Sequence, residues 1–294
     1  MGARDAFDEP LLAGVDRASR EYAFTARDFE RVRRLIHARA GINLSDSKHS
    51  MVYSRLSRRL RALGMDSVGS YLDRLEGDTA FAAQEEQSFI NALTTNLTAF
   101  FREPHHFPVL ADFLRNNSDR APARLWCAAA STGEEPYSIA MTMIEALGER
   151  TGARLLATDI DTNVLAVGRA GVYRLDAAQR CGEQRLRRFF LRGRGGNEGL
   201  VRVRPELAAL VSFAAINLLD EQWSPLQSFA ATVDVVFCRN VMIYFDKPTQ
   251  RRVLSRIARV LRPGGLLFAG HAESFTDCRE WFALRGKTVY ERLA

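Results

Sequence analysis

The chain has 294 residues, of which 47% are hydrophobic and 26% charged, a balance typical of globular proteins and long enough for two domains. It contains no run of about 18 apolar residues, so no membrane span is expected. Residues 1–20 hold four acidic residues and no apolar core, and we interpret them as a disordered leader rather than a signal peptide. The four cysteines show no CxxC spacing and no Cys/His cluster, which predicts a reduced, cytosolic protein without a metal site.

Positive charge is concentrated in the first part of the chain. The formal net charge is +6 at pH 7. Residues 27–61 hold ten basic residues against three acidic ones, a local excess of seven positive charges. Such an excess favours an acidic partner, which can be a nucleic acid, an anionic membrane surface or an acidic protein. It can also serve solubility in part.

The first part of the chain is typical of a small all-helical domain. Apolar residues recur at helical spacing over residues 28–40 and 47–63, and glycines follow both segments. Shorter helices are expected near residues 67–76 and 81–95. On the second helix three arginines lie three and four positions apart and therefore share one face; they are Arg55, Arg58 and Arg59.

After about residue 120, short apolar runs alternate with helical patterns, which predicts an α/β domain with a parallel sheet covered on both faces. The expected helices span residues 134–147, 162–170 and 248–261. The expected strands span residues 125–130, 154–158, 210–215, 233–238 and 266–269. Residues 172–205 interrupt this rhythm with several glycines and one alternating segment, Leu200–Arg204, which we interpret as an edge strand of a small β insertion.

Two segments of the α/β domain predict a nucleoside site. Residues 126–138 pass from a strand through small residues and Gly133 into a helix, so a ligand can approach the backbone and the helix start. Asp159 ends the next strand, where α/β proteins hold ribose hydroxyls. Each segment has an ordinary alternative, because the first can be a plain βα turn and Asp159 or Asp161 can cap a helix.

Two further segments carry polar residues, and packing does not explain Arg239 and Asn240 in the first of them. The strand that ends near Cys238 delivers Arg239 and Asn240 at its carboxyl end, and Tyr244 follows; ligands bind at that edge of open α/β sheets. Residues 94–103 join the two domains and read Thr-Thr-Asn-Leu-Thr-Ala-Phe-Phe-Arg-Glu. They either pack on the sheet domain or line a cleft. The two histidines that follow are expected at the surface.

Taken together, residues 94–103, 128–137, 157–161, 217–219 and 237–246 resemble the CheR family of chemotaxis receptor protein-glutamate O-methyltransferases. The resemblance covers nearly all of residues 25–292, including Gly270-His271-Ala272-Glu273, where the usual family form is Gly-His-Ser-Glu. It implies a helical N-terminal domain at residues 21–92, a linker at 93–120 that contributes to the active site, and a class I S-adenosylmethionine-dependent methyltransferase domain at 121–294. That domain is Rossmann-like, with a mostly parallel sheet and a small β subdomain at about residues 172–205.

The resemblance also implies the site residues and partners. The basic N-terminal helix with Arg55, Arg58 and Arg59 is expected to dock on a receptor's cytoplasmic methylation helices, and in some family members the β subdomain binds a receptor's C-terminal peptide. Arg102 and Tyr244 are expected nearest the reacting methyl group. The protein is expected to act as a cytoplasmic monomer, without nucleic acid or membrane insertion. The residues expected to contact S-adenosylmethionine are Asn96, Thr98, Arg102, Glu135, Asp159, Asn217, Leu218, Arg239 and Asn240.

The chemistry is compatible with the motifs. A glutamate carboxylate has a reference pKa of about 4.3 and is already ionised at neutral pH, so it needs no general base. Arg102 is the natural partner of a carboxylate of the substrate or of the cofactor, and Tyr244 either orients the nucleophile or walls the methyl group. One rival is a nucleic-acid methyltransferase, but the chain has no DPPY or NPPY string and no Pro-Cys nucleophile. The other is a cofactor-sensing scaffold without activity.

Overall fold

The structure is a computed structural model that describes residues 21–120, 122–149 and 151–294, so the predicted leader lies outside the described residues. The described chain forms two compact units, residues 21–32 with 45–86 and residues 33–44 with 87–294. Helices α1 (Ala26–Ala40) and α4 (Thr79–Leu93) contribute residues to both. Among the described helices, none combines the length and the apolar character that crossing a membrane requires.

The first unit is helical, as predicted. Besides parts of α1 and α4 it contains η1 (Asp46–Lys48), α2 (His49–Leu63) and α3 (Val68–Gly77). The apolar stripe of α2 is buried because Val52, Leu56 and Leu60 point into the helical core. Gly64 ends α2 in a left-handed conformation with φ 63°. Ser67 starts α3 by accepting a hydrogen bond from the Ser70 N–H.

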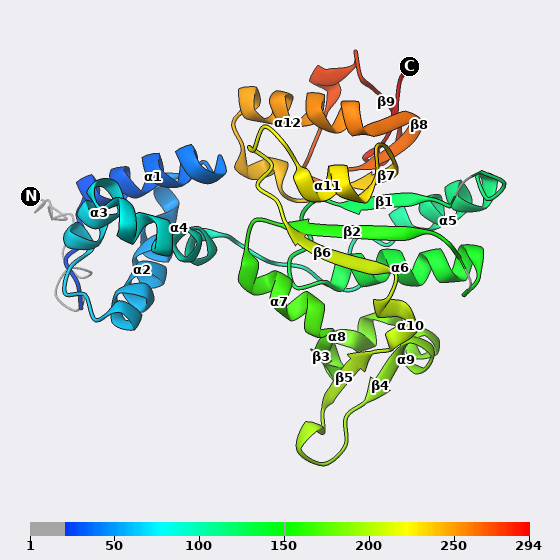
Figure 1. Cartoon of the computed structure of the whole chain (residues 1–294), viewed down its shortest axis with the longest axis horizontal. Coiled ribbons are helices and arrows are strands. Elements are labelled where there is room, and N and C mark those ends of the chain that lie inside the picture. The colour runs from blue at the N-terminus through cyan, green and yellow to red at the C-terminus, as the bar shows by residue number, and fades with distance from the viewer. Residues whose placement is uncertain (1–20, 121, 150) are drawn as a thin grey trace, which may run out of the picture. The chain divides into compact units, whose positions relative to one another are not determined.

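The second unit is built on a seven-stranded sheet with the spatial order β6-β2-β1-β7-β8-β10-β9 (Figure 1). The five strands from β6 to β8 run parallel, which confirms the predicted parallel sheet, and β10 runs antiparallel to both β8 and β9. The strands are β1 (Arg124–Cys127), β2 (Arg154–Asp159), β6 (Val211–Ala215), β7 (Val233–Phe237), β8 (Leu261–Phe268), β9 (Phe282–Gly286) and β10 (Val289–Arg292).

Helices cover both faces of this sheet, and side chains alternate between two cores along each strand. Trp126, Leu156 and Val236 pack with α11 (Ser224–Phe229) and α12 (Lys247–Val260) on one face. Cys127, Val235 and their neighbours pack with helices on the other face (Figure 1). Those helices are α5 (His106–Asn116), α6 (Glu134–Leu147) and α7 (Thr162–Ala170). The bounds of α6 and α7 equal the predicted ones, whereas α5 lies within the predicted linker.

The predicted β insertion is an antiparallel sheet with the order β3-β5-β4. Its strands are β3 (Val172–Arg174), β4 (Phe190–Arg192) and β5 (Leu200–Val203), and the helices α8 (Leu175–Ala178), η2 (Gln179–Cys181), α9 (Glu183–Phe189), η3 (Gly195–Asn197) and α10 (Pro205–Ala208) accompany them. The prediction that Leu200–Arg204 is an edge strand is wrong, because β5 is the central strand. Its alternation arises from two different faces, since Val201 and Val203 are buried while Arg202 is exposed.

Three further details differ from the sequence expectations. β8 starts at Leu261, five residues earlier than predicted, and its pairing with β7 shifts register because the Arg-Pro-Gly-Gly segment is a bulge within the strand. Strands β9 and β10 had no sequence prediction. The short helices η4 (Met242–Tyr244) and η5 (Thr276–Cys278) had none either. All four cysteines are free and buried.

Candidate active site

The strand order places a ligand site at the carboxyl ends of β1 and β7. Successive strands step away from β1 in one direction through β2 to β6 and in the other direction from β7 to β8. The connections that leave β1 and β7 therefore diverge, and at such a point a ligand crevice is expected outside the carboxyl ends of the strands of an open α/β sheet. The predicted segments at residues 128–135 and 238–244 follow these two strands directly.

The turn after β1 is shaped by two residues with positive φ. Ser131 has φ 47° and Gly133 has φ 99°, so the chain turns sharply before α6 begins at Glu134. A Cβ atom on Gly133 would lie 2.6 Å from Tyr173 Oη and 2.9 Å from Gly168 Cα. Glycine is thus required by close packing as well as by its backbone conformation.

Asp159 ends β2 and holds the turn after β1. Its Oδ2 accepts a hydrogen bond from the Ser131 N–H at 2.8 Å, and its Oδ1 accepts one from the Asp161 N–H at 3.0 Å. Burial raises the pKa of Asp159 to about 6, although the hydrogen bonds from the main chain oppose the rise. The carboxylate lies at the edge where the sequence places it, and its contact with a ribose stays a prediction.

Asp161 connects this edge to the segment at residues 94–103. It caps α7, as one sequence alternative proposed, by accepting a hydrogen bond from the Asn163 N–H at 2.9 Å. Its other oxygen accepts hydrogen bonds from Thr94 Oγ1 at 2.7 Å and from Asn96 Nδ2 at 2.8 Å. The Asn96 carbonyl accepts one from Ser131 Oγ at 2.9 Å. The predicted Asn96 is therefore fixed beside the Asp159 edge.

The remainder of this segment carries Arg102, which has no acidic partner. Its guanidinium donates a hydrogen bond to the Leu97 carbonyl at 2.9 Å, and in the described part of the chain no carboxylate forms an ion pair with it. Leu97 is 79% exposed, the largest value among the exposed large hydrophobic residues of the described chain. Thr98 is partly exposed. Both an unpaired cation and an apolar side chain thus face solvent in the predicted catalytic segment.

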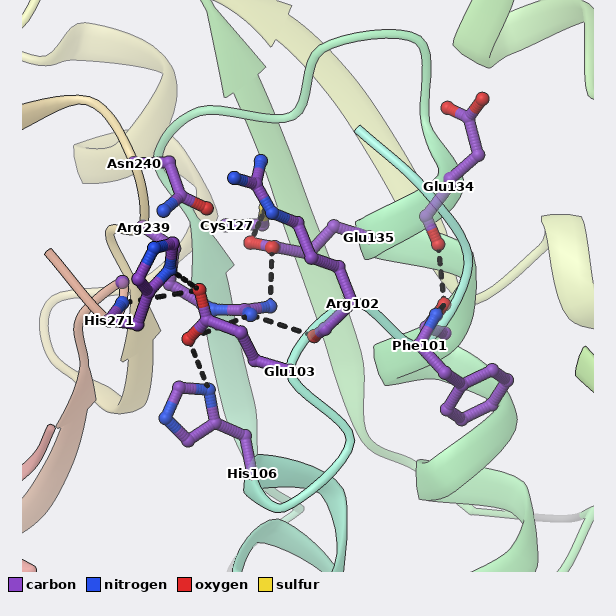
Figure 2. A network of polar contacts seen from close by, with 12 residues as sticks. Phe101, Arg102, Glu103, His106, Cys127, Glu134, Glu135, Arg239, Asn240 and His271 are labelled. Atoms are coloured by element: carbon purple, nitrogen blue, oxygen red, sulfur yellow. Dashed lines mark hydrogen bonds and ion pairs between the residues drawn. The ribbon is translucent and has the colours of Figure 1, made fainter. Parts of the chain in front are cut away.

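Arg239 joins three segments of the site, and its side chain is completely buried (Figure 2). It donates hydrogen bonds to Glu135 Oε2 and to the Arg102 carbonyl, both at 2.7 Å, and its guanidinium lies 3.3 Å from Glu103 Oε2. Burial raises the pKa of Glu135, and the charge of Arg239 opposes this rise. Arg239 and Glu135 make these contacts with other groups of the protein, so a cofactor contact by either residue stays a prediction.

Glu103 extends this network to His271. Its Oε1 accepts hydrogen bonds from the main-chain N–H of His271 at 3.2 Å and from His271 Nδ1 at 2.9 Å (Figure 2). Burial opposes ionisation of Glu103, but His271 and the charge of Arg239 outweigh it and lower the pKa to about 2. Glu103 was not among the predicted site residues.

The expectation that both histidines after this segment lie at the surface is wrong for His106, which is fully buried. Burial and the charges of Arg239 and His105 lower its pKa to about 4, so it is neutral at pH 7. Glu103, His105 and His106 each offer one ligand atom, and these atoms lie within 4.8 Å of one another. Because Arg239 already neutralises Glu103, the cluster disfavours a divalent ion; the absence of a metal stays a prediction.

Two further predicted residues follow β6. Asn217 donates from Nδ2 to the Arg39 carbonyl at 2.7 Å, and its Oδ1 accepts a hydrogen bond from the Leu219 N–H at 3.0 Å. Leu218 is buried. Asn217 therefore shapes the turn after the strand with its own side chain, and any contact of Asn217 or Leu218 with S-adenosylmethionine stays a prediction.

After β7, Asn240 adopts φ 58°, a conformation that non-glycine residues rarely adopt. Tyr244 lies in η4 with its side chain partly exposed, and its carbonyl accepts a hydrogen bond from the Asn43 N–H at 2.8 Å. Glu273, whose only sequence signal is its place in the Gly270-His271-Ala272-Glu273 motif, accepts hydrogen bonds from this segment. The acid three positions after Gly270 was the available signal, but nothing in the sequence shows what it contacts.

The three predicted docking arginines lie on α2 in the first unit and differ in their contacts. Arg58 is exposed. Arg59 forms an ion pair with Glu85 through two nitrogen atoms, and Tyr71 Oη donates to the same carboxylate at 2.9 Å. Glu85 is only 3% exposed. Arg59 therefore stabilises the helical unit, whatever else it contacts, and the docking role of Arg55, Arg58 and Arg59 stays a prediction.

Comparisons with known proteins agree with this architecture. The family model described as CheR methyltransferase, all-alpha domain, matches residues 27–94, and the model described as CheR methyltransferase, SAM binding domain, matches residues 96–291. The chain is 54% identical over 269 residues to a protein of Salmonella typhimurium named chemotaxis protein methyltransferase, with 91% of each chain covered. It is 53% identical over 269 residues to a protein of Escherichia coli with the same name, again with 91% of each chain covered.

A third relative is the chemotaxis protein methyltransferase 2 of Pseudomonas aeruginosa, which is 51% identical over 274 residues, covering 92% of this chain and 95% of the relative. The two family models together extend over both described units. The chain therefore belongs to the CheR methyltransferase family, whose sheet domain binds S-adenosylmethionine.

Proposed function

We propose that the protein transfers the methyl group of S-adenosylmethionine to glutamate side chains of methyl-accepting chemotaxis receptors, forming glutamate methyl esters and S-adenosylhomocysteine. Family membership and the chemotaxis names of its relatives support the methyltransferase activity and its setting. We place this activity in the cytoplasm, in a monomer that acts on the cytoplasmic domain of the receptor. These names do not state which group of the receptor is methylated, and the arguments for a glutamate side chain come from the site geometry.

The residues at the carboxyl edge fit the proposed cofactor. The turn after β1 carries the small side chains of Ala128–Ser131, so a ligand can lie close to the backbone. The buried carboxylate of Asp159 lies beside this turn, where it is suited to two ribose hydroxyl groups. We propose that the cofactor is held by Asn96, Thr98, Arg102, Glu135, Asp159, Asn217, Leu218, Arg239 and Asn240, the last two and Glu135 partly through the segments that they position.

The proposal that the acceptor is a carboxylate rests on which charged groups at the site are already paired. Glu135 and Glu103 are paired with Arg239, and Asp159 is hydrogen-bonded to two main-chain N–H groups. Arg102 alone among these groups forms no ion pair within the described chain, although its charge is near enough to Glu135 to oppose the rise in that residue's pKa. A carboxylate of a protein substrate would complete it, as the carboxylate of the cofactor would, because guanidinium and carboxylate form strong paired hydrogen bonds.

The chemistry needs alignment rather than proton removal. When bound, the cofactor supplies an activated methyl group on a sulfonium with a good leaving group. An ionised glutamate needs no base. The buried histidine beside the site, His106, is not needed in that role, and its Nε2 lies 3.1 Å from Thr288 Oγ1 and 3.3 Å from the Lys287 carbonyl. Arg102 would hold the carboxylate in line while Tyr244 orients it or walls the reacting centre. Such positioning contributes several kcal/mol, up to about 7–11 in ideal cases.

The receptor would meet surfaces outside this crevice as well. The exposed Arg58 and its neighbour Arg55 on α2 provide positive charge for acidic methylation helices. Leu97 and Ile243, which are 79% and 48% exposed, lie in the two segments that carry Arg102 and Tyr244. We propose that these two side chains contact the apolar residues flanking the modified glutamate. A receptor C-terminal peptide would bind the sheet of β3, β4 and β5.

The test is an incubation of the protein with methyl-labelled S-adenosylmethionine and a receptor cytoplasmic fragment, with RNA as the control substrate. A carboxyl methyl ester is released by mild base, so base-labile label on the fragment is the expected result. Label that resists base would point to methylated nitrogen, and label on RNA would favour the nucleic-acid rival. No transfer to either substrate, with intact cofactor binding, would favour the scaffold.

A further inference from the structure

Glu273 is a buried acid in a turn just beyond β8, outside all the residues assigned to the site so far. Its side chain is 5% exposed. The turn runs from Gly270 to Glu273 and is closed by a hydrogen bond from the Glu273 N–H to the Gly270 carbonyl at 2.9 Å. In the described chain no lysine, arginine or histidine forms an ion pair with this carboxylate. A buried carboxylate must be stabilised by its neighbours, so its contacts define what it does.

Three main-chain N–H groups surround the carboxylate. Oε2 accepts hydrogen bonds from the N–H groups of Asn240 at 2.9 Å and Gly270 at 2.6 Å, and Oε1 accepts one from Met242 at 2.8 Å. Hydrogen bonds to an ionised oxygen are roughly twice as strong as neutral ones. We call Glu273 with these three N–H groups the Glu273 clamp. It ties the loop after β7 to the end of β8.

The loop held by the Glu273 clamp is strained and carries predicted site residues. Asn240 adopts φ 58°, which costs a non-glycine residue about 1 kcal/mol or more and persists only where the surroundings hold it. Gly270 lies so close that a Cβ atom would be 2.3 Å from Asn240 Nδ2 and 2.9 Å from Asn240 N. The clamp therefore determines where the side chain of Asn240 points, and it fixes Met242, the first residue of η4, two positions before Tyr244.

The same turn reaches the second catalytic segment. His271 lies between the residues of the Glu273 clamp and donates to Glu103 Oε1 through its main-chain N–H and its Nδ1 (Figure 2). Glu103 directly follows Arg102. The turn from Gly270 to Glu273 thus contacts both segments that bear the proposed catalytic residues, Arg102 on one side and Tyr244 on the other.

We propose that Glu273 is a positioning residue of the methyl transfer reaction. It touches neither methyl donor nor acceptor; it holds the loop from Asn240 to Tyr244 in the geometry that the reaction requires, through three main-chain N–H groups. The kinetic test of this inference rests on the proposed function. The position of the loop can also be tested by ligand binding, which does not depend on that function.

The test compares Glu273→Gln with Asp234→Asn. Glutamine keeps the size of the side chain but turns one acceptor oxygen into a donor, so at least one N–H of the clamp faces another donor. Asp234 is the matched control, because it also accepts a main-chain N–H, that of Arg124 at 2.8 Å, and lies near the amino end of β7, away from the crevice. Both variants lose one carboxylate that accepts a main-chain N–H, and only Glu273→Gln touches the loop.

With a receptor fragment and S-adenosylmethionine, Glu273→Gln is expected to lower kcat by about 100-fold, as a misplaced catalytic group does, while KM for the fragment changes little. Asp234→Asn is expected to lower the melting temperature but to leave kcat unchanged at temperatures where it is folded. A wild-type kcat in Glu273→Gln would overturn the proposal, and so would an equal loss of kcat in Asp234→Asn.

Two additions keep the outcome decisive. If Glu273→Gln does not fold, Gly270→Ala displaces Asn240 by contact without removing the carboxylate, and it must also lower kcat for the proposal to stand. If the wild-type protein methylates no glutamate, the proposed function fails and the clamp is judged by calorimetry with S-adenosylhomocysteine alone. Glu273→Gln should then bind about tenfold more weakly and Asp234→Asn with unchanged affinity; equal affinities would overturn the clamp.

Discussion

The two ends of β7 are both held by carboxylates, but they are held for different purposes. Near the amino end, Asp234 accepts the Arg124 N–H and forms an ion pair with Arg262, and both charged side chains remain partly exposed. Beyond the carboxyl end, Glu273 is buried and holds three N–H groups of a loop with a left-handed Asn240. At the amino end, the carboxylate therefore only joins β7 to its neighbours β1 and β8.

Buried charge and strain in the sheet unit are thus gathered beyond the carboxyl ends of the strands. There Arg239 is fully buried between two acids, and Asp159 has its pKa raised by burial. Burying such groups costs free energy unless each is paired or hydrogen-bonded, so a fold that concentrates them at one edge must be stabilised elsewhere. The difference between the two ends is therefore a physical argument for function at the carboxyl end, independent of family membership.

The largest expected effect is that of Arg102→Ala. Its guanidinium donates a hydrogen bond to the Leu97 carbonyl, forms no ion pair within the described residues and is partly exposed, so the fold should be little affected. In contrast, kcat should fall by at least about 100-fold because a charged group that holds the reacting carboxylate is lost. Arg124→Ala is the matched control at the amino end, since Arg124 Nη1 also donates to main-chain carbonyls. Wild-type turnover in Arg102→Ala would remove Arg102 from the site.

The next effect is that of Asp159→Ala on cofactor binding. If the carboxylate accepts the ribose hydroxyl groups, its loss should weaken the affinity for S-adenosylhomocysteine by about ten- to a hundredfold, the size expected for hydrogen bonds to a charged group. Calorimetry measures this directly. Because Asp159 also holds Ser131, the folded fraction must be checked by circular dichroism. An unchanged affinity would count against the ribose contact.

The pH dependence of binding gives a further test. Burial raises the pKa of Asp159 from 3.8 to about 6, so between these values the carboxyl group is protonated in the folded protein and ionised in the unfolded chain. Its contribution to stability is therefore full below about pH 4 and is lost as the pH rises through 6. Hydroxyl donors favour the carboxylate, so affinity for S-adenosylhomocysteine should fall by up to about tenfold per pH unit below 6. Asp159→Asn should be flat over this range.

The smallest kinetic effect is expected in the helical unit, where substitutions of Arg58 and Arg59 should have different consequences. Arg58→Glu should raise KM for a receptor fragment about threefold, the size of a single exposed charge contact, without changing the melting temperature. Arg59→Glu should lower the unfolding free energy by about 1–3 kcal/mol, because Glu85 loses its partner while buried. A loss of stability in Arg58→Glu would contradict the assignment of Arg58 to the exposed face.

The sequence predicted those helices whose bounds are set by residues next to them in the chain. Helices α6 and α7 match their predicted bounds because Asp161 caps α7 and Gly148 and Gly171 follow the two helices at their C-terminal ends. The alternation in β5 reported its two faces but not its central place, since strand order depends on partners. Strands β9 and β10 lack a clear period and had no prediction.

The candidate site was predicted in its parts but not in its connections. The positions of Asp159, Arg239 and Asn240 at strand ends follow from a parallel sheet, whatever the partners. The partner of Arg239 is Glu135, 104 positions away in the sequence, and Glu273 lies 33 positions from Asn240. A single sequence contains no signal for pairings at such separations, and the burial of His106 depends on contacts with Lys287 and Thr288 near the end of the chain.

We propose that the carboxyl edge of the sheet methylates glutamate side chains of a receptor. Peptide mass mapping of a receptor cytoplasmic fragment, after incubation with the wild-type protein and S-adenosylmethionine, locates the methyl group on the substrate. We expect the mass of one added methyl group on glutamate-containing peptides, and no addition when those glutamates are replaced by glutamine. A methyl group on lysine, or one that persists after the replacement, would contradict it.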